Sequence, residues 1–182
     1  MAKVRLQPLF HESMRRGIPV GVALTALIGC TLGFVFYNEL SVAIMALLVA
    51  IPFLIAYNMM MVCRREPACL GFAQLWMSGI VQFICGGLIT ALVIMVYLMM
   101  HPGFLGDYFH RTLQMLAEMA AREGRPMPVE PAGLPAPSVT SFVGSIFWSL
   151  SFFGSVLSML LGLTLPLLPA FRRLCMRSNQ QN

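Results

Sequence analysis

Charged residues are scarce in this chain. Asp, Glu, Lys and Arg together make up 10% of its 182 residues, while 58% are hydrophobic and the mean hydropathy is +0.80. Soluble globular domains carry about 25% charged residues, so this scarcity excludes an ordinary water-soluble domain. Four stretches without Asp, Glu, Lys or Arg are each long enough to cross a hydrocarbon core, which needs about 20 helical residues. These stretches are 17–38, 40–63, 67–106 and 131–171.

Ionisable side chains are absent from the expected spans. We expect transmembrane helices at about 18–37, 40–62, 73–100 and 139–168, and these ranges contain no Asp, Glu, Lys, Arg or His. Proton-coupled transporters and pumps ordinarily need an ionisable group inside the membrane. The sequence therefore disfavours a proton-driven antiporter, and it leaves an uncharged pathway or lipid movement open.

Signatures of catalysis and of metal or cofactor binding are also missing. No recognisable motif combines a nucleophile with an activating base. The five cysteines lack the paired short spacing and neighbouring His of a zinc site, and no glycine-rich phosphate loop is present. We therefore expect a protein that is not an enzyme, with no catalytic residues, no metal site and no cofactor.

The basic residues are unevenly placed around the expected spans. Nine of the twelve fall on one side: Lys3, Arg5, Arg15, Arg16, Arg64, Arg65, Arg172, Arg173 and Arg177. The positive-inside rule then places both termini in the cytoplasm. Basic residues at these positions meet anionic headgroups, so the net charge of +5 does not require a nucleic-acid partner.

The segment between the third and fourth spans has helical periodicity. Over about 103–122, Leu105, Tyr108, Leu113 and Leu116 fall on one face while charged residues fall on the other. This pattern predicts an amphipathic helix along the outer membrane surface. The following residues, 124–138, contain five prolines and predict a stiff, extended linker. Together these features predict one all-α membrane domain over residues 1–182, with four antiparallel transmembrane helices in a bundle.

Small residues recur at helical spacing in the first and fourth spans. The first series is Gly17, Gly21, Thr25, Gly29 and Gly33, and the second is Ser151, Ser155, Ser158 and Gly162. In lipid, helices associate through close packing, which small residues permit. Each series therefore predicts a tight helix contact. A contact within the same chain is the favoured interpretation, and a contact with another protein remains open.

Polar side chains follow one face of the third span. Gln74, Ser78 and Gln82 recur every four residues, and amides are costly in hydrocarbon unless they are paired. This face therefore meets protein or water. It is either a polar groove for a substrate headgroup or a set of hydrogen bonds to a neighbouring span, for example to Asn58, with Gln74 near the cytoplasmic interface. We favour the second interpretation.

Several short motifs suggest a family. They are Gly71-Phe72-Ala73-Gln74, Gly79, Tyr97 and Pro102-Gly103-Phe104-Leu105. Together with the layout of the chain, they resemble an uncharacterised family of small four-span bacterial inner-membrane proteins, labelled only as a domain of unknown function. The resemblance implies a four-span fold and an inner-membrane location, and it brings no catalytic residues.

Two functional hypotheses follow. The first is a non-enzymatic membrane subunit or scaffold that docks a partner in envelope or lipid-linked glycan assembly. The alternative is a small oligomeric transporter or lipid-translocating protein that uses the Gln74–Gln82 face as its polar path. The expected partners are membrane lipids and either another membrane protein or a second copy of the chain.

Overall fold

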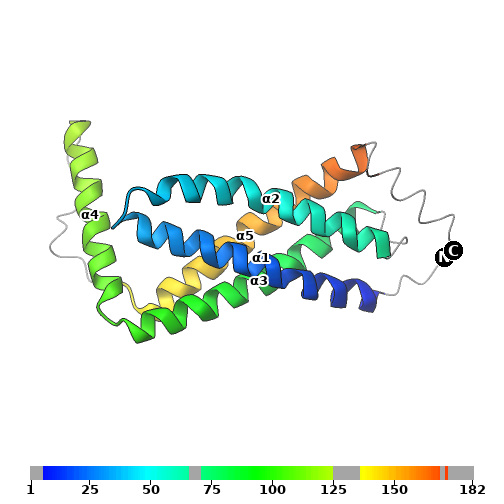
Figure 1. The fold of residues 1–182 in the computed structure, drawn as a ribbon, viewed down its shortest axis with the longest axis horizontal. Helices are drawn as coiled ribbons and strands as arrows, with labels where there is room; N and C mark the ends of the chain where they lie inside the picture. Colours follow the sequence, from blue (N-terminus) through cyan, green and yellow to red (C-terminus); the bar gives the residue numbers. More distant parts are fainter. Residues whose placement is uncertain (1–5, 66–70, 125–135, 169–170, 172–182) are drawn as a thin grey trace.

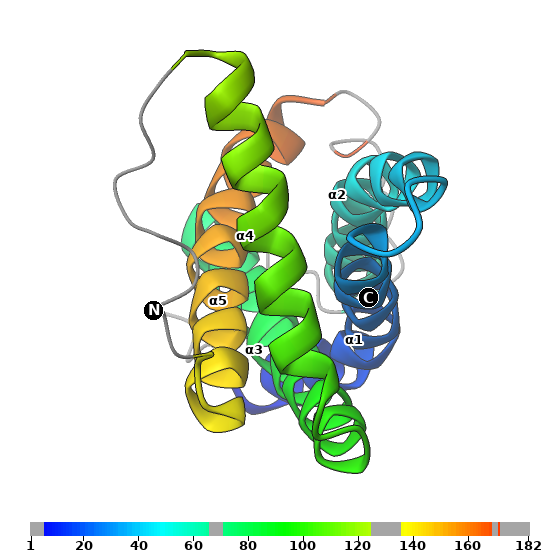
Figure 2. The same cartoon turned by 90° about the vertical axis from the view of Figure 1, so that its left-hand side faces the viewer.

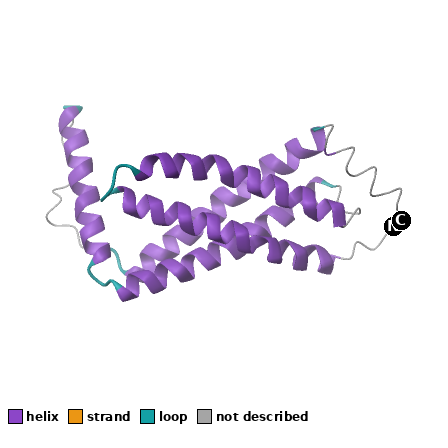
Figure 3. Cartoon of the chain, in the orientation of Figure 1, coloured by secondary structure: helices purple, strands orange, loops and turns teal. Residues whose placement is uncertain are grey.

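The computed structural model describes residues 6–65, 71–124, 136–168 and 171, and its regular structure in these residues is entirely helical (Figures 1 and 3). The helices are α1 (Leu6–Phe34), α2 (Leu40–Arg65), α3 (Phe72–Met100), α4 (Phe104–Arg122) and α5 (Val139–Thr164), followed by the short 3-10 helix η2 (Leu165–Leu167). Four of the described helices are long and apolar enough to cross a membrane, with spans Phe10–Phe34, Leu40–Val62, Phe72–Met100 and Val139–Leu167. Helices suit a membrane because their backbone N–H and C=O groups form hydrogen bonds within the helix, where lipid offers no partner. The prediction of an all-α, four-span protein is confirmed.

The four long helices run alternately in opposite directions, and α3 is central (Figure 1). It packs along α1 on one side and along α5 on the other, while α2 packs mainly on α1. Helices α2 and α5 lie on opposite sides of the bundle and touch only over a short stretch (Figure 2). The bundle is therefore tightly built around α1 and α3 and more open between α2 and α5.

The buried apolar residues form two clusters along the bundle. The larger contains Val20, Leu24, Ile51, Ile55, Met59, Val62, Leu75, Phe83, Leu165 and Phe171. The smaller contains Leu32, Ile94, Leu98, Leu105 and Val143. Because Leu105 belongs to α4, the second cluster ties that helix to one end of the bundle, called here the α4 end.

The first apolar helix begins earlier than predicted. Its apolar span starts at Phe10 instead of residue 18, and Pro19 lies inside α1. The helix continues through residues 10–17 because one of its faces packs on α3, where Ser13 is fully buried. His11, Glu12, Arg15 and Arg16 therefore belong to the same continuous helix as the first apolar span, within its first turns.

Helix α4 confirms the predicted amphipathic helix between the third and fourth spans. It lies across one end of the bundle (Figures 1 and 2). Most of the predicted linker, residues 125–135, lies outside the described residues. Helix α5 begins at Val139, where the Ser138 hydroxyl accepts a hydrogen bond from the Ser141 backbone N–H.

Candidate functional site

Helices α1 and α3 cross at backbone contact. A Cβ added to Gly21 would lie 3.1 Å from the Gly86 Cα, and one added to Gly86 would lie 3.0 Å from the Gly21 nitrogen. A Cβ on Gly17 would lie 2.8 Å from the Cys85 Cβ. The first half of the glycine series in α1 thus permits the close approach of α3.

Two threonines continue this crossing. The Thr25 hydroxyl donates to the Gly21 carbonyl at 2.8 Å, and the Thr90 hydroxyl donates to the Gly86 carbonyl at 3.0 Å. The two hydroxyl oxygens lie 3.2 Å apart, so the polar groups of both helices meet in the contact. Satisfying each hydroxyl within the protein removes the cost of placing it in hydrocarbon.

The last two glycines of the α1 series, Gly29 and Gly33, do not lie in the close contact with α3. A Cβ on Gly33 would meet the Leu40 side chain at the start of α2, at 2.7 Å. A Cβ on Gly29 would have nothing within 4 Å. The five predicted packing residues therefore do not form one helix contact: Gly17, Gly21 and Thr25 face α3, whereas Gly29 borders open space.

The small residues of α5 pack on the other side of α3. A Cβ on Gly79 would overlap Ser158, and one on Gly162 would lie 3.4 Å from the Phe72 ring. The Ser155 carbonyl accepts a hydrogen bond from Trp76 Nε1 at 3.3 Å. The Ser151 hydroxyl oxygen is buried and has no hydrogen-bond partner among the described residues.

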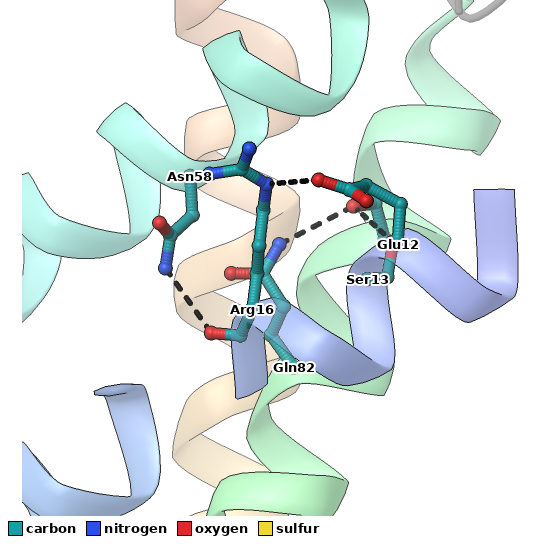
Figure 4. Close-up of polar contacts among 6 residues, drawn as sticks. Glu12, Ser13, Arg16, Asn58 and Gln82 are labelled. Atoms are coloured by element: carbon teal, nitrogen blue, oxygen red, sulfur yellow. Dashed lines mark hydrogen bonds and ion pairs between the residues drawn. The ribbon is translucent and has the colours of Figure 1, made fainter. Parts of the chain in front are cut away.

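The polar face of α3 is covered by α1 (Figure 4). The Ser13 and Ser78 hydroxyl oxygens lie 2.8 Å apart, and Gln82 Nε2 donates to the Ser78 oxygen at 3.3 Å. Ser78 and Gln82 are fully buried, and Gln82 Oε1 has no hydrogen-bond partner in the described part of the chain. These two residues therefore line the contact between α3 and α1.

Charged and amide groups from α1 and α2 lie beside this contact. Arg16 Nε donates to Glu12 Oε1 at 2.9 Å, and Asn58 Nδ2 donates to the Arg16 carbonyl at 3.3 Å. Asn58 thus bonds α1 instead of the Gln74–Gln82 face. The ion pair balances two charges that are largely covered by the bundle, at 18% and 15% exposure.

Gln74 lies apart from Ser78 and Gln82. Its side-chain Oε1 accepts a hydrogen bond from the Gly71 backbone N–H at 3.1 Å, which caps the start of α3. Such a cap satisfies a backbone donor that has no partner within its own helix. The three residues proposed as one polar face therefore divide into a helix cap and a buried pair.

The sequence interpretation missed Ser13, Glu12 and Arg16 because it began the first span at residue 18. One signal could have found Ser13, since it lies four residues before Gly17 and extends the same series of small residues. Glu12 and Arg16 share the spacing that pairs side chains on a helix.

Aromatic rings join α4 to the bundle. The Phe104 ring lies 5.4 Å from Phe36 and 5.3 Å from Tyr97, measured between centroids. The Arg111 guanidinium carbon lies 4.6 Å from the centre of the Phe36 ring. Aromatic residues commonly gather where a span meets the membrane surface, which fits the position of this cluster at the α4 end.

Within the described ranges, no group of three His, Cys, Asp or Glu side chains is arranged to hold a metal ion. No curated protein and no solved structure matches the chain. The model of one protein family, described as a protein of unknown function (DUF4199), matches residues 16–165, from α1 to the end of α5. The chain therefore belongs to the DUF4199 family.

Proposed function

We propose that this protein is a non-enzymatic membrane subunit that docks a transmembrane helix of a partner protein between α2 and α5. The supporting observation is an apolar cleft of about 400 Å³ between these two helices. Its walls are α2 and α5, and its floor is α1 and α3. Residues along it include Leu48, Pro52, Phe83, Phe153 and Leu160.

The small residues of α1 and α5 that face α3 already pack within the chain, which leaves the cleft between α2 and α5 as the surface for a partner. Gly17, Gly21 and Ser158 are buried against α3, so they have no free face for a partner. The spans on either side of the cleft are the least buried, at 11% for α2 and 17% for α5. A partner helix in the cleft would give them the packing that α1 and α3 already have. Packing is the main source of helix association in lipid.

The placement in a cell follows from charge. The basic residues gather at the ends of the long helices that lie away from α4, and this asymmetry favours both termini in the cytoplasm. The family resemblance supports a bacterial inner membrane as the compartment. Helix α4 then lies on the outer surface, where envelope and lipid-linked glycan assembly take place. The partner belongs to such an assembly pathway.

The test is recovery of a partner from native membranes. The tagged chain is expressed at its natural level and extracted with a mild detergent, and co-purifying proteins are quantified by mass spectrometry. We expect one membrane protein in fixed stoichiometry with the wild type. Leu48→Trp and Leu160→Trp, which fill the cleft from each wall, should each lower its recovery at least about tenfold.

Val42→Trp is the matched control, because Val42 also lies on α2 with 75% exposure but does not line the cleft. It should leave recovery unchanged. Equal recovery in the cleft variants and the control would place the partner elsewhere. A protein that is fully active alone in pure liposomes would overturn the subunit proposal.

The alternative of a transporter that uses the polar face of α3 gains less support. Ser78 and Gln82 are covered by α1, and Gln74 caps the helix end. A path along this face would require α1 to separate from α3 at the Gly21–Gly86 contact, where the two backbones touch.

A further inference from the structure

A groove opens between α1 and α3 at the α4 end of the bundle. It has a volume of about 620 Å³, within the range of pockets that hold small molecules. It is lined by residues of α1 and the turn that follows, by Val93, Ile94 and Tyr97 of α3, and by Phe104 of α4. This groove, called here the α1–α3 groove, is separate from the cleft between α2 and α5.

Glycine creates the α1–α3 groove. The backbones of α1 and α3 touch at Gly21 and Gly86, and Thr25 continues this close contact toward the α4 end. Beyond Thr25, Gly29 and Gly33 line the groove and add no side chain to it, while Leu32 of α1 also lines it. A Cβ on Gly29 would have nothing within 4 Å, so the space is not taken by another part of the described chain.

The mouth of the groove has different chemistry from its interior. Tyr37 and Tyr97 line it, and neither phenol hydroxyl has a hydrogen-bond partner in residues 6–65, 71–124 or 136–168. The Arg111 guanidinium stacks on Phe36, another lining residue. Among the same residues, no carboxylate lies within ion-pair distance of Arg111. The mouth thus offers one cation and two hydroxyl donors beside an apolar interior.

We propose that the α1–α3 groove binds one anionic phospholipid, with an acyl chain along Gly29 and Gly33 and the phosphate beside Arg111. The groove opens toward the lipid, since Val93 and Tyr97 are 47% and 40% exposed. Whatever fills an apolar space on this surface of a spanning protein is an acyl chain or another helix. The charge of Arg111 complements a phosphate, and a basic side chain near the membrane surface attracts anionic lipids.

The geometry of the mouth favours a lipid over a helix. A flexible acyl chain can follow a space between two helices that is lined by the Tyr37, Tyr97 and Phe104 rings, whereas a helix needs a broad, regular surface. A docked apolar helix would carry no anionic or accepting side chain, so it would leave the Arg111 charge and the two phenol hydroxyls unpaired. A phospholipid supplies an apolar chain and an anionic acceptor in one molecule.

Lipid titration of the purified full chain tests the proposal. The protein is delipidated in mild detergent, and dioleoylphosphatidylglycerol or dioleoylphosphatidylcholine is added while bound molecules are counted by native mass spectrometry. We expect one tightly bound phosphatidylglycerol and weaker phosphatidylcholine binding. Arg111→Gln should lower phosphatidylglycerol affinity about fivefold and abolish the preference between the two lipids.

Gly29→Leu should fill the groove and lower the affinity for both lipids about tenfold, because the acyl chain loses its packing contacts. Val93→Trp fills the groove from the opposite wall and should lower the affinity for both lipids in the same way. It replaces Gly29→Leu as the test if that variant folds poorly. Gly144→Leu is the control, since a Cβ there also meets nothing within 4 Å but Gly144 does not line the groove.

Unchanged lipid binding in both groove variants would overturn the proposal. A second result would also overturn it: if the wild-type chain forms a dimer and Gly29→Leu dissociates that dimer without changing lipid binding, a second copy occupies the groove. The outcome of the lipid titration does not depend on whether a partner docks in the α2–α5 cleft. Leu48→Trp and Leu160→Trp test that docking separately.

Discussion

The α1–α3 pair and the α2–α5 pair show two ways in which apolar helices are placed in one bundle. Helix α3 has 33% of its apolar span buried and α1 has 28%, against 17% for α5 and 11% for α2. Yet α2 and α3 have nearly the same mean hydropathy, 2.5 and 2.4, although α3 is the most buried span and α2 the least. Hydropathy therefore indicates which helices enter the membrane and does not indicate which of them form the core.

Small residues explain the difference between the pairs. The α1–α3 contact is made where glycines let two backbones touch, and serine and threonine hydroxyls pair within it. The facing parts of α2 and α5 carry larger side chains, including Leu48, Phe153 and Leu160, around an open cleft. Lipid tails are as apolar as leucine, so leucines alone give two helices little reason to associate.

Gly86→Leu should have the largest effect, because it breaks the tighter pair. A side chain at Gly86 would collide with the backbone of α1 at Gly21, which cannot move as a flexible side chain would. We expect a loss of about 3 kcal/mol or more in the free energy of unfolding, at the upper end of the usual cost of overpacking. Titration with a denaturing detergent, followed by circular dichroism, measures it. Gly144→Leu, in open space, should stay within about 0.5 kcal/mol of the wild type, and equal losses in both would refute the explanation.

Ser78→Ala should have the next largest effect. It removes the acceptor of the buried Gln82 amide and the partner of the Ser13 hydroxyl. We expect a loss of about 1 kcal/mol, since hydrogen bonds between membrane helices contribute modestly. Gln82→Met should be closer to neutral, because it also removes an Oε1 that has no partner in the described residues. The double variant completes a thermodynamic cycle, and a coupling energy of zero would show that the two side chains do not interact.

The sequence predicted the four spans and the amphipathic helix because hydropathy and periodicity act over many residues. It predicted less well where a helix began, since Phe10–Gly17 is helical through burial of Ser13 against α3. A repeat of small residues identified contact surfaces but not their partners. Gly21 and Gly29 belong to one series, yet only the path of α3 decides that the first is packed and the second lines a groove.

Phe104→Ala should have a local effect at the α4 end. It removes the ring that contacts both Phe36 and Tyr97, and such aromatic pairs contribute about 0.5–1.5 kcal/mol each. We expect amide hydrogen exchange in α4 to accelerate about tenfold while exchange at the Gly21–Gly86 crossing stays the same. Acceleration in both regions would show that the α4 end and the tight pair are coupled.

Val42→Ala on α2 should have the smallest effect, and it sharpens the comparison from the open side. Val42 is 75% exposed, so the purified chain surrounds it with detergent or lipid. Exchanging one apolar side chain for a smaller one there should change the free energy of unfolding by less than about 0.5 kcal/mol.

Leu48→Ala, at the cleft, should also cause only a small loss in the free energy of unfolding of the purified chain. If the partner is then reconstituted, Leu48→Ala should become destabilising while Val42→Ala stays neutral, because only the cleft position would gain a packed neighbour. A large loss for Val42→Ala in the purified chain would instead mean that α2 packs against protein on its outer face, and the contrast between the two pairs would fail.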